Sequence, residues 1–116
     1  MASHLDLGKK GELLALEHLR THHYHILDTN WRAGRQEIDI IAMDGNCLVF
    51  IEVKARSSVL FGCPEIKVNA TKRLKIRSVA ESYMSCMPQP PRSIRFDIIA
   101  ITIKPVYELM HFRDAF

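Results

Sequence analysis

The order of hydrophobic and polar positions divides the chain into helical and extended segments. Two stretches place apolar residues on one stripe of a helical wheel, and the others alternate or run continuously between turn residues, as strands do. The predicted elements are a helix over 5–22, strands over 24–32, 36–44 and 47–55, a second helix over 69–86, a strand over 94–103 and a short final strand over 105–112. This αβββαββ order predicts a mixed α/β fold in which helices flank a mostly antiparallel sheet.

The hairpin EIDIIAMDGNCLVFIEVKAR, residues 37–56, has the composition of a buried sheet but carries charges in its middle and at its open end. Charges in central strands are disfavoured unless they are paired or bound to something. Side chains alternate between faces along a strand. Four charged residues are therefore expected on one face: Glu37, Asp39, Glu52 and Lys54.

The register of this hairpin decides how close the acids lie. A Gly45-Asn46 loop places Asp39 directly opposite Glu52, with Cβ atoms roughly 5 Å apart. An Asp44-Gly45 loop, which turn preferences favour, leaves the pair diagonal at roughly 7–8 Å. A three-residue loop would separate them. In the first two registers, alternate positions of the second strand form one apolar face: Ile38, Ile40 and Ala42.

Two interpretations of the charged face remain open at this point. Neighbouring carboxylates repel each other, and a divalent cation such as Mg²⁺ would relieve that repulsion because hard ions prefer oxygen ligands. The alternative is a salt bridge between Lys54 and one of the acids. The E-x-K tripeptide does not decide between them, since this composition yields roughly one acid-x-Lys by chance.

Each predicted helix directs one charged residue inward. Glu12 lies near the centre of the apolar stripe that should pack on the sheet, although an acid near the first turn also suits the helix dipole. Lys72 extends the apolar stripe of the second helix, although a lysine can snorkel from such a position to solvent. Both residues are therefore candidates for a site, with an ordinary structural role as the alternative.

The second helix and the segment before it form the most basic region of the chain: Lys67, Lys72, Arg73, Lys75 and Arg77. With Arg56, after the third strand, these residues are candidates for a rim that binds phosphates. A solvated basic face is the alternative.

Bulk properties narrow the function classes only modestly. The 116 residues suit one domain, and the net charge of +3 permits a polyanionic partner without requiring one. The three cysteines contain no CxxC pair, which argues against a disulfide framework or structural zinc and favours a reducing cytoplasm. No apolar run approaches the roughly 18 residues of a membrane span, and the start lacks a signal-peptide core.

Several blocks in order, "GKKGE", "NWRAGRQEIDIIA", "LVFIEVKARSS" and "FRDAF", resemble the YraN family of small bacterial proteins almost end to end. That family is similar to archaeal-type Holliday junction resolvases and to the wider PD-(D/E)xK nuclease superfamily. The resemblance implies a restriction-endonuclease-like core and Mg²⁺- or Mn²⁺-dependent cleavage of DNA phosphodiesters.

The resemblance also implies roles for individual residues. Asp39 matches the metal-binding aspartate of the superfamily, and Glu52 and Lys54 match its E-x-K half. Glu12 matches the helix-borne glutamate of resolvase-like members. Glu37 belongs to the G-E-I-D block and is a weaker candidate, because Gln36 stands where that block usually has Gly.

The residues and the resemblance are compatible with three functions. The first is a metal-dependent DNA endonuclease, including one that acts on branched or junction DNA. The second is a DNA-binding module that keeps the site residues without turnover, and the third is an adaptor that contacts a protein of DNA repair or recombination. The sequence leaves open whether the chain acts alone or as a homodimer.

Overall fold

The computed structural model describes residues 4–58 and 69–116. The helices in these ranges are α1 (His4–Thr21) and α2 (Ala70–Ser85). The strands are β1 (His25–Ala33), β2 (Gln36–Asp44), β3 (Cys47–Ser58), β4 (Ser93–Lys104) and β5 (Glu108–Phe112). The predicted αβββαββ order is confirmed. The last strand begins at Glu108 and not at 105, because Pro105 has no N–H to donate to a ladder.

The strands form one sheet in the order β1-β2-β3-β4-β5. All neighbours are antiparallel except β3 and β4, which run parallel. A parallel pair needs a crossover connection, and α2 lies in the segment that joins these two strands. The prediction of a mixed α/β fold with a mostly antiparallel sheet is therefore confirmed, and the arrangement is consistent with a restriction-endonuclease-like core.

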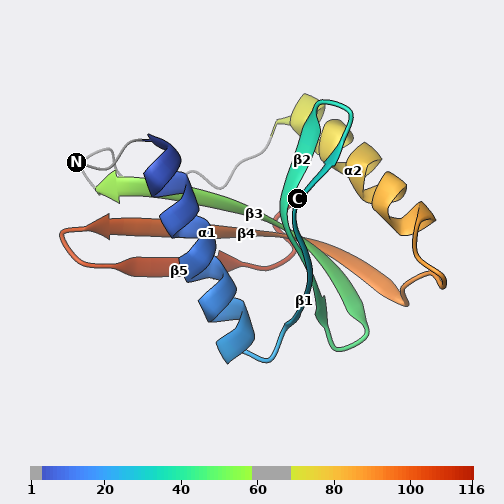
Figure 1. The fold of residues 1–116 in the computed structure, drawn as a ribbon, viewed down its shortest axis with the longest axis horizontal. Coiled ribbons are helices and arrows are strands. Elements are labelled where there is room, and N and C mark those ends of the chain that lie inside the picture. The colour runs from blue at the N-terminus through green and yellow to red at the C-terminus, as the bar shows by residue number, and fades with distance from the viewer. Residues whose placement is uncertain (1–3, 59–68) are drawn as a thin grey trace.

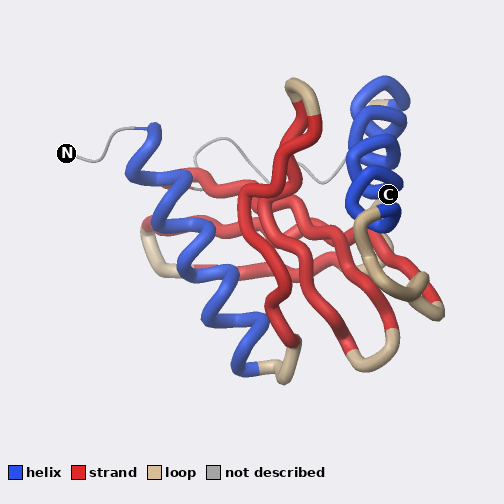
Figure 2. Tube along the Cα trace, turned by 45° about the vertical axis from the view of Figure 1, so that its right-hand side comes forward, coloured by secondary structure: helices blue, strands red, loops and turns tan. Residues whose placement is uncertain are grey.

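The two helices cover opposite faces of the sheet. Figure 2 shows the strands between α1 and α2, and α1 crosses β3 and β4 in Figure 1. Ala15 and Leu19 of α1 are buried on one face, and Ile76 and Val79 of α2 on the other. Burial of one large aliphatic side chain contributes about 1.5–3 kcal/mol, so these stripes fix both helices on the sheet.

Strand β2 changes its pairing along its length. It pairs with β3 from Asp44↔Cys47 to Ile40↔Ile51, and it continues beside β1 as far as Gln36. The loop between β2 and β3 is therefore Gly45-Asn46, the first of the predicted registers, and Gly45 adopts a left-handed φ of 61° that glycine tolerates. Beyond Ile40 the two strands separate.

The separation overturns one prediction about the faces of β2. Ile40 and Ala42 lie in the α1-side core as expected, but Ile38 lies in the α2-side core with Ile41. Strict alternation would place Ile38 with Ile40. The pairing of β2 with β3 ends at Ile40, so beyond this residue the side chains of β2 need not alternate relative to the plane of β3.

Asp39 occupies the point where β2 and β3 separate. Its Oδ2 atom accepts a hydrogen bond of 2.8 Å from the backbone N–H of Val53 on β3. A carboxylate thus takes the place of the carbonyl that a regular ladder would supply. We call the opening bounded by Asp39 and Val53 the fork.

A fully buried aspartate anchors β4 to its surroundings. Asp97 is fully buried and accepts hydrogen bonds from Arg95 Nε at 2.9 Å, His111 Nε2 at 2.7 Å and the backbone N–H of Asp114 at 2.9 Å. Arg95 also pairs with Asp44 at 3.0 Å. These donors and the Arg95 charge outweigh burial and lower the pKa of Asp97.

Asp97→Asn should destabilise the protein by about 3–5 kcal/mol at pH 7, because it leaves the half-buried Arg95 without its closest counter-charge. The contribution of Asp97 is full above the ordinary carboxyl pKa and is lost as the pH falls through the lowered folded value. The difference between wild type and variant in urea unfolding should therefore shrink towards pH 3.

Asp44→Asn is the matched control, since it removes the more exposed partner of the same arginine. It should cost about 1 kcal/mol or less. Equal losses in the two variants would contradict the role given to Asp97.

Candidate metal centre

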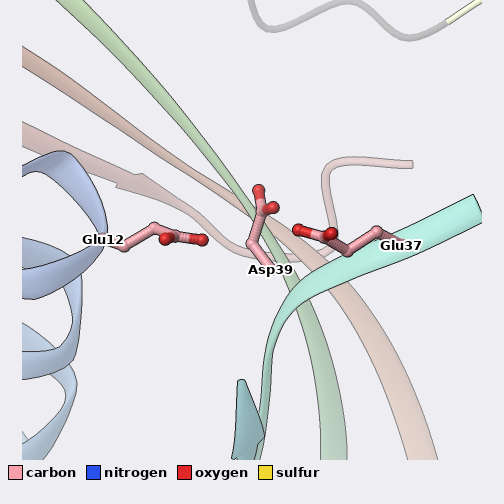
Figure 3. Close-up of side chains that lie close together, drawn as sticks. All are labelled: Glu12, Glu37 and Asp39. Carbon is pink, nitrogen blue, oxygen red and sulfur yellow. The ribbon is translucent and has the colours of Figure 1, made fainter. Parts of the chain in front are cut away.

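Three carboxylates from two elements converge at the fork. Glu12 of α1 and Glu37 and Asp39 of β2 each offer one oxygen, and these oxygens lie within 4.8 Å of one another. Figure 3 shows Glu12 and Glu37 reaching towards Asp39 from opposite sides. Among the residues that the structure describes, this is the group of acids, histidines or cysteines whose spacing could hold a metal ion.

Glu12 reaches the fork because α1 packs unusually close to β3 at the preceding residue. Gly11 is buried, and a Cβ atom placed there would lie 2.7 Å from Cβ of Ala55. Only glycine permits this approach. Glu12 is half-buried at the rim of the fork, as expected from its place on the inward stripe.

Asp39 is the acid whose ionised form the fold disfavours. Burial is the main cause that raises the pKa of Asp39, to about 6. The Val53 N–H opposes this shift, and the nearby negative charges of Glu12, Glu52 and Glu37 add to it. Ionised Asp39 forms no ion pair with the described residues, so its charge lacks there the partner that a carboxylate withdrawn from solvent normally has.

Asn30 of β1 is a site residue that the sequence analysis missed. Its Nδ2 atom donates to Glu12 Oε1 at 2.6 Å and to Glu37 Oε1 at 2.9 Å, so one amide group ties both acids together. Its backbone has a φ of 50°, a conformation in which asparagine is enriched. The available signal was an asparagine in the middle of a strand, where this residue type is depleted.

Glu52 approaches Asp39 from the α2 side of the sheet. Its Oε1 atom forms an ion pair with Nζ of Lys72, and its Oε2 atom is buried without a hydrogen-bond partner in the described part of the chain. Glu37, Asp39, Glu52 and Lys72 line a cavity of about 50 Å³. The structure thus groups Glu12 and Asp39 with Glu37, the weaker candidate, and places Glu52 beside this group on the other face.

Lys54 is half-buried on β3, opposite Ala100 of β4. Its side chain forms no ion pair with the described acids, so the alternative of a salt bridge from Lys54 is not found there. The cationic group that Glu52 contacts is the ammonium of Lys72 on α2.

The predicted nucleic-acid-binding residues are spread over two elements. Arg56 is half-buried and its Nε donates to Thr102 Oγ1 at 3.2 Å. Arg73 and Arg77 are exposed on α2, and the Arg77 guanidinium lies 4.8 Å from the centre of the Phe96 ring. Lys67 lies outside the described residues. Asn69 caps α2 by accepting from the backbone N–H of Lys72 at 2.8 Å.

The model of the uncharacterised protein family UPF0102 matches residues 11–101, a range that includes the fork, Lys54 and most of β4. The chain belongs to the UPF0102 family. It is 47% identical over 112 residues to a UPF0102 protein of Thermodesulfovibrio yellowstonii, covering 97% of this chain and 96% of the relative. A UPF0102 protein of Flavobacterium psychrophilum is 46% identical, with 100% and 98% covered.

The donor set of this UPF0102 chain fits a hard divalent cation. The converging ligand atoms are all carboxylate oxygens, the type that Mg²⁺ and Mn²⁺ prefer. The buried, unpartnered Oε2 of Glu52 is a further acceptor beside Asp39.

Neither helix in the described ranges is long and apolar enough to cross a lipid bilayer.

Asp39→Asn should stabilise the metal-free protein by about 1–3 kcal/mol at pH 8, because it removes a buried negative charge while its amide oxygen can still accept from Val53. The folded pKa of Asp39 is raised, so its contribution to stability is present below its unfolded pKa and is lost as the pH rises through about 6. Urea unfolding in EDTA should show the gain at pH 8 and little at pH 4.

Glu17→Gln, a change at an exposed acid of the same helix as Glu12, serves as the control and should have little effect at either pH. A destabilised Asp39→Asn variant at pH 8 would show that Asp39 is an ordinary structural partner.

Asn30→Asp should destabilise the metal-free protein by about 1–2 kcal/mol at pH 8, because it replaces two charge-assisted hydrogen bonds with a further negative charge. Aspartate tolerates the left-handed backbone, so the loss reports the side chain alone. The same substitution at exposed Asn46 should change little. Equal unfolding curves for both variants would reject the bridging role of Asn30.

Proposed function

We propose that this UPF0102 protein is a metal-dependent DNA endonuclease that hydrolyses phosphodiester bonds. The observation that carries the proposal is the convergence of the Glu12, Glu37 and Asp39 carboxylates in the fork. Such a cluster costs stability through like-charge repulsion, which adds to burial in raising the pKa of Asp39. A bound cation would offset it.

Asp39 is the central ligand in this proposal, because it belongs to the cluster with Glu12 and also lines a cavity with Glu52. Glu12 and Glu37 would hold the cation on one side, with Asn30 fixing their orientation. A Mg²⁺ or Mn²⁺ ion supplies Lewis-acid polarisation of the phosphate and an attacking water of lowered pKa.

Lys54 is proposed to stabilise the negative charge that develops on the phosphate. It is half-buried two residues after Glu52 on β3, and alternation places both side chains on the same face. Its lack of an ion pair to described acids leaves the ammonium available for an anion. Arg56, Lys72, Arg73 and Arg77 are proposed to contact the DNA backbone.

One contact favours a second candidate, a DNA-binding module without turnover. The ion pair between Lys72 and Glu52 already gives Glu52 a counter-charge. If that pair persisted with DNA bound, the E-x-K glutamate would not be available to a cation. Cleavage assays separate this candidate from the nuclease.

We expect the wild-type protein to cleave at least one of single-stranded, duplex, flap and four-way DNA when Mg²⁺ or Mn²⁺ is added. Asp39→Asn, Glu52→Gln and Lys54→Ala should each abolish cleavage with the fold intact by thermal unfolding. Because the three residues act as a unit, double variants should be scarcely worse than single ones.

Glu17→Gln should cleave as wild type does, since Glu17 is exposed on α1 and outside the fork. Near wild-type turnover in any of the three site variants would reject the role given to that residue. Salt-dependent binding without cleavage of any of the four DNAs would favour the non-catalytic module.

A further inference from the structure

A groove adjoins the carboxylate cluster on the α1 side of the sheet. It encloses about 390 Å³ and its apolar wall is formed by Leu13 and Leu16 of α1 and by Ile40 of β2. We call it the α1 groove. Its volume and its mostly apolar lining, with a few polar groups, are typical of a small-molecule pocket.

The α1 groove is continuous with the carboxylate cluster. A second hollow of about 260 Å³ contains Glu37, and it shares four residues with the groove: Lys9, Glu12, Asn30 and Asp39. A ligand that fills both would therefore contact acids and a lysine at one end and aliphatic side chains at the other.

Leu13 of α1 does not contribute to either hydrophobic core. It is 67% exposed, and it belongs to neither core cluster, whereas its neighbours Leu14 and Leu16 pack against the α1-side core. Residues 9, 13 and 16 follow helical spacing, so Lys9, Leu13 and Leu16 lie on one side of α1. The exposed leucine thus stands between a cationic group and the apolar floor of the groove.

We infer that the α1 groove binds one unpaired nucleobase of a DNA strand whose adjoining phosphate lies at the carboxylate cluster. The inference rests on the proposed function and names its substrate class. A nucleotide combines a flat, largely apolar base, which suits the aliphatic end of the hollow, with a phosphate, which a cation held by the carboxylates would bind at the other end. Lys9, at the boundary, complements the charge of the phosphate.

This placement favours DNA with unpaired nucleotides over an uninterrupted duplex. A base inside a duplex is stacked and paired, and moving it into a side pocket costs unstacking energy that is smallest when the base is already unpaired. The preference would arise from the groove and not from reading of the sequence, because aliphatic walls distinguish the four bases poorly.

Binding to three labelled duplexes tests the inference, with fluorescence anisotropy in Mn²⁺ as the measurement. The duplexes are identical except that one is fully paired, one carries a single bulged adenosine, and one carries an abasic nucleotide at the bulge. Wild type should bind the adenosine bulge about five- to tenfold more tightly than the abasic bulge, a difference of about 1–1.4 kcal/mol.

Leu13→Ser should remove this preference and leave the affinity for the fully paired duplex unchanged. Leu74→Ser is the matched control, since Leu74 is 70% exposed on α2 and lines no part of the groove. It should keep the preference. Thermal unfolding of both variants should match wild type, because both leucines are largely solvated.

Cleavage of the same three duplexes separates the inference from the proposed function. Cleavage without any dependence on the bulged base overturns the groove and leaves the nuclease. Base-dependent binding that Leu13→Ser removes, without cleavage, supports the groove and rejects the nuclease. Equal effects of Leu13→Ser and Leu74→Ser overturn the groove, and failure to bind all three duplexes overturns both proposals.

Discussion

The hydrogen bond from the Val53 N–H to the Asp39 carboxylate is the contact on which the site depends. A regular sheet would pair β2 and β3 to their ends and would bury no acid between them. Here the ladder stops at Ile40, and a side chain completes the backbone pairing of β3. The opening holds a carboxylate at the centre of the fold, within reach of both helices.

The molecule treats the buried Asp97 and the half-buried Asp39 in opposite ways. Asp97 is surrounded by donors and a guanidinium, so its pKa falls and its charge stabilises the sheet. Asp39 is withdrawn from solvent beside other acids, so burial and, to a smaller extent, their charges raise its pKa and its own charge opposes folding. The stability that Asp97 and the two cores provide offsets the repulsion at the fork, as is common where a fold prepares a site for a ligand.

The sequence predicted the elements and the charged strands well, because both depend on local periodicity. Asp39 and Glu12 were found from alternation and from a helical wheel, since each lies where a carboxylate conflicts with an apolar pattern. Alternation failed at Ile38 because this rule assumes that β2 stays in one flat sheet with its neighbours. The point where β2 separates from β3 depends on how β1, β2 and β3 pair, and the pattern within one strand does not contain that information.

Contacts between distant segments were not predictable from patterns of this kind. The pairing of Glu52 with Lys72 joins β3 to α2, and neither residue signals the other in sequence. Asn30 is recognisable only once its amide is seen to join Glu12 and Glu37. Glu37, and not Glu52, is the third member of the cluster, and this follows from the same separation of β2 from β3 that places Ile38 in the α2-side core.

Gly11 has no side-chain functional group, yet it controls how closely Glu12 approaches the acids of β2. A methyl group there would collide with the Ala55 side chain, so the helix approaches β3 more closely than any residue with a Cβ atom would permit. Any larger residue would lift α1, and with it Glu12, away from the acids of β2. Ions of different radius demand different spans between their ligands. Under the proposed function, the preference of the centre for one cation over another would thus be set by a residue that contacts neither the ion nor the substrate.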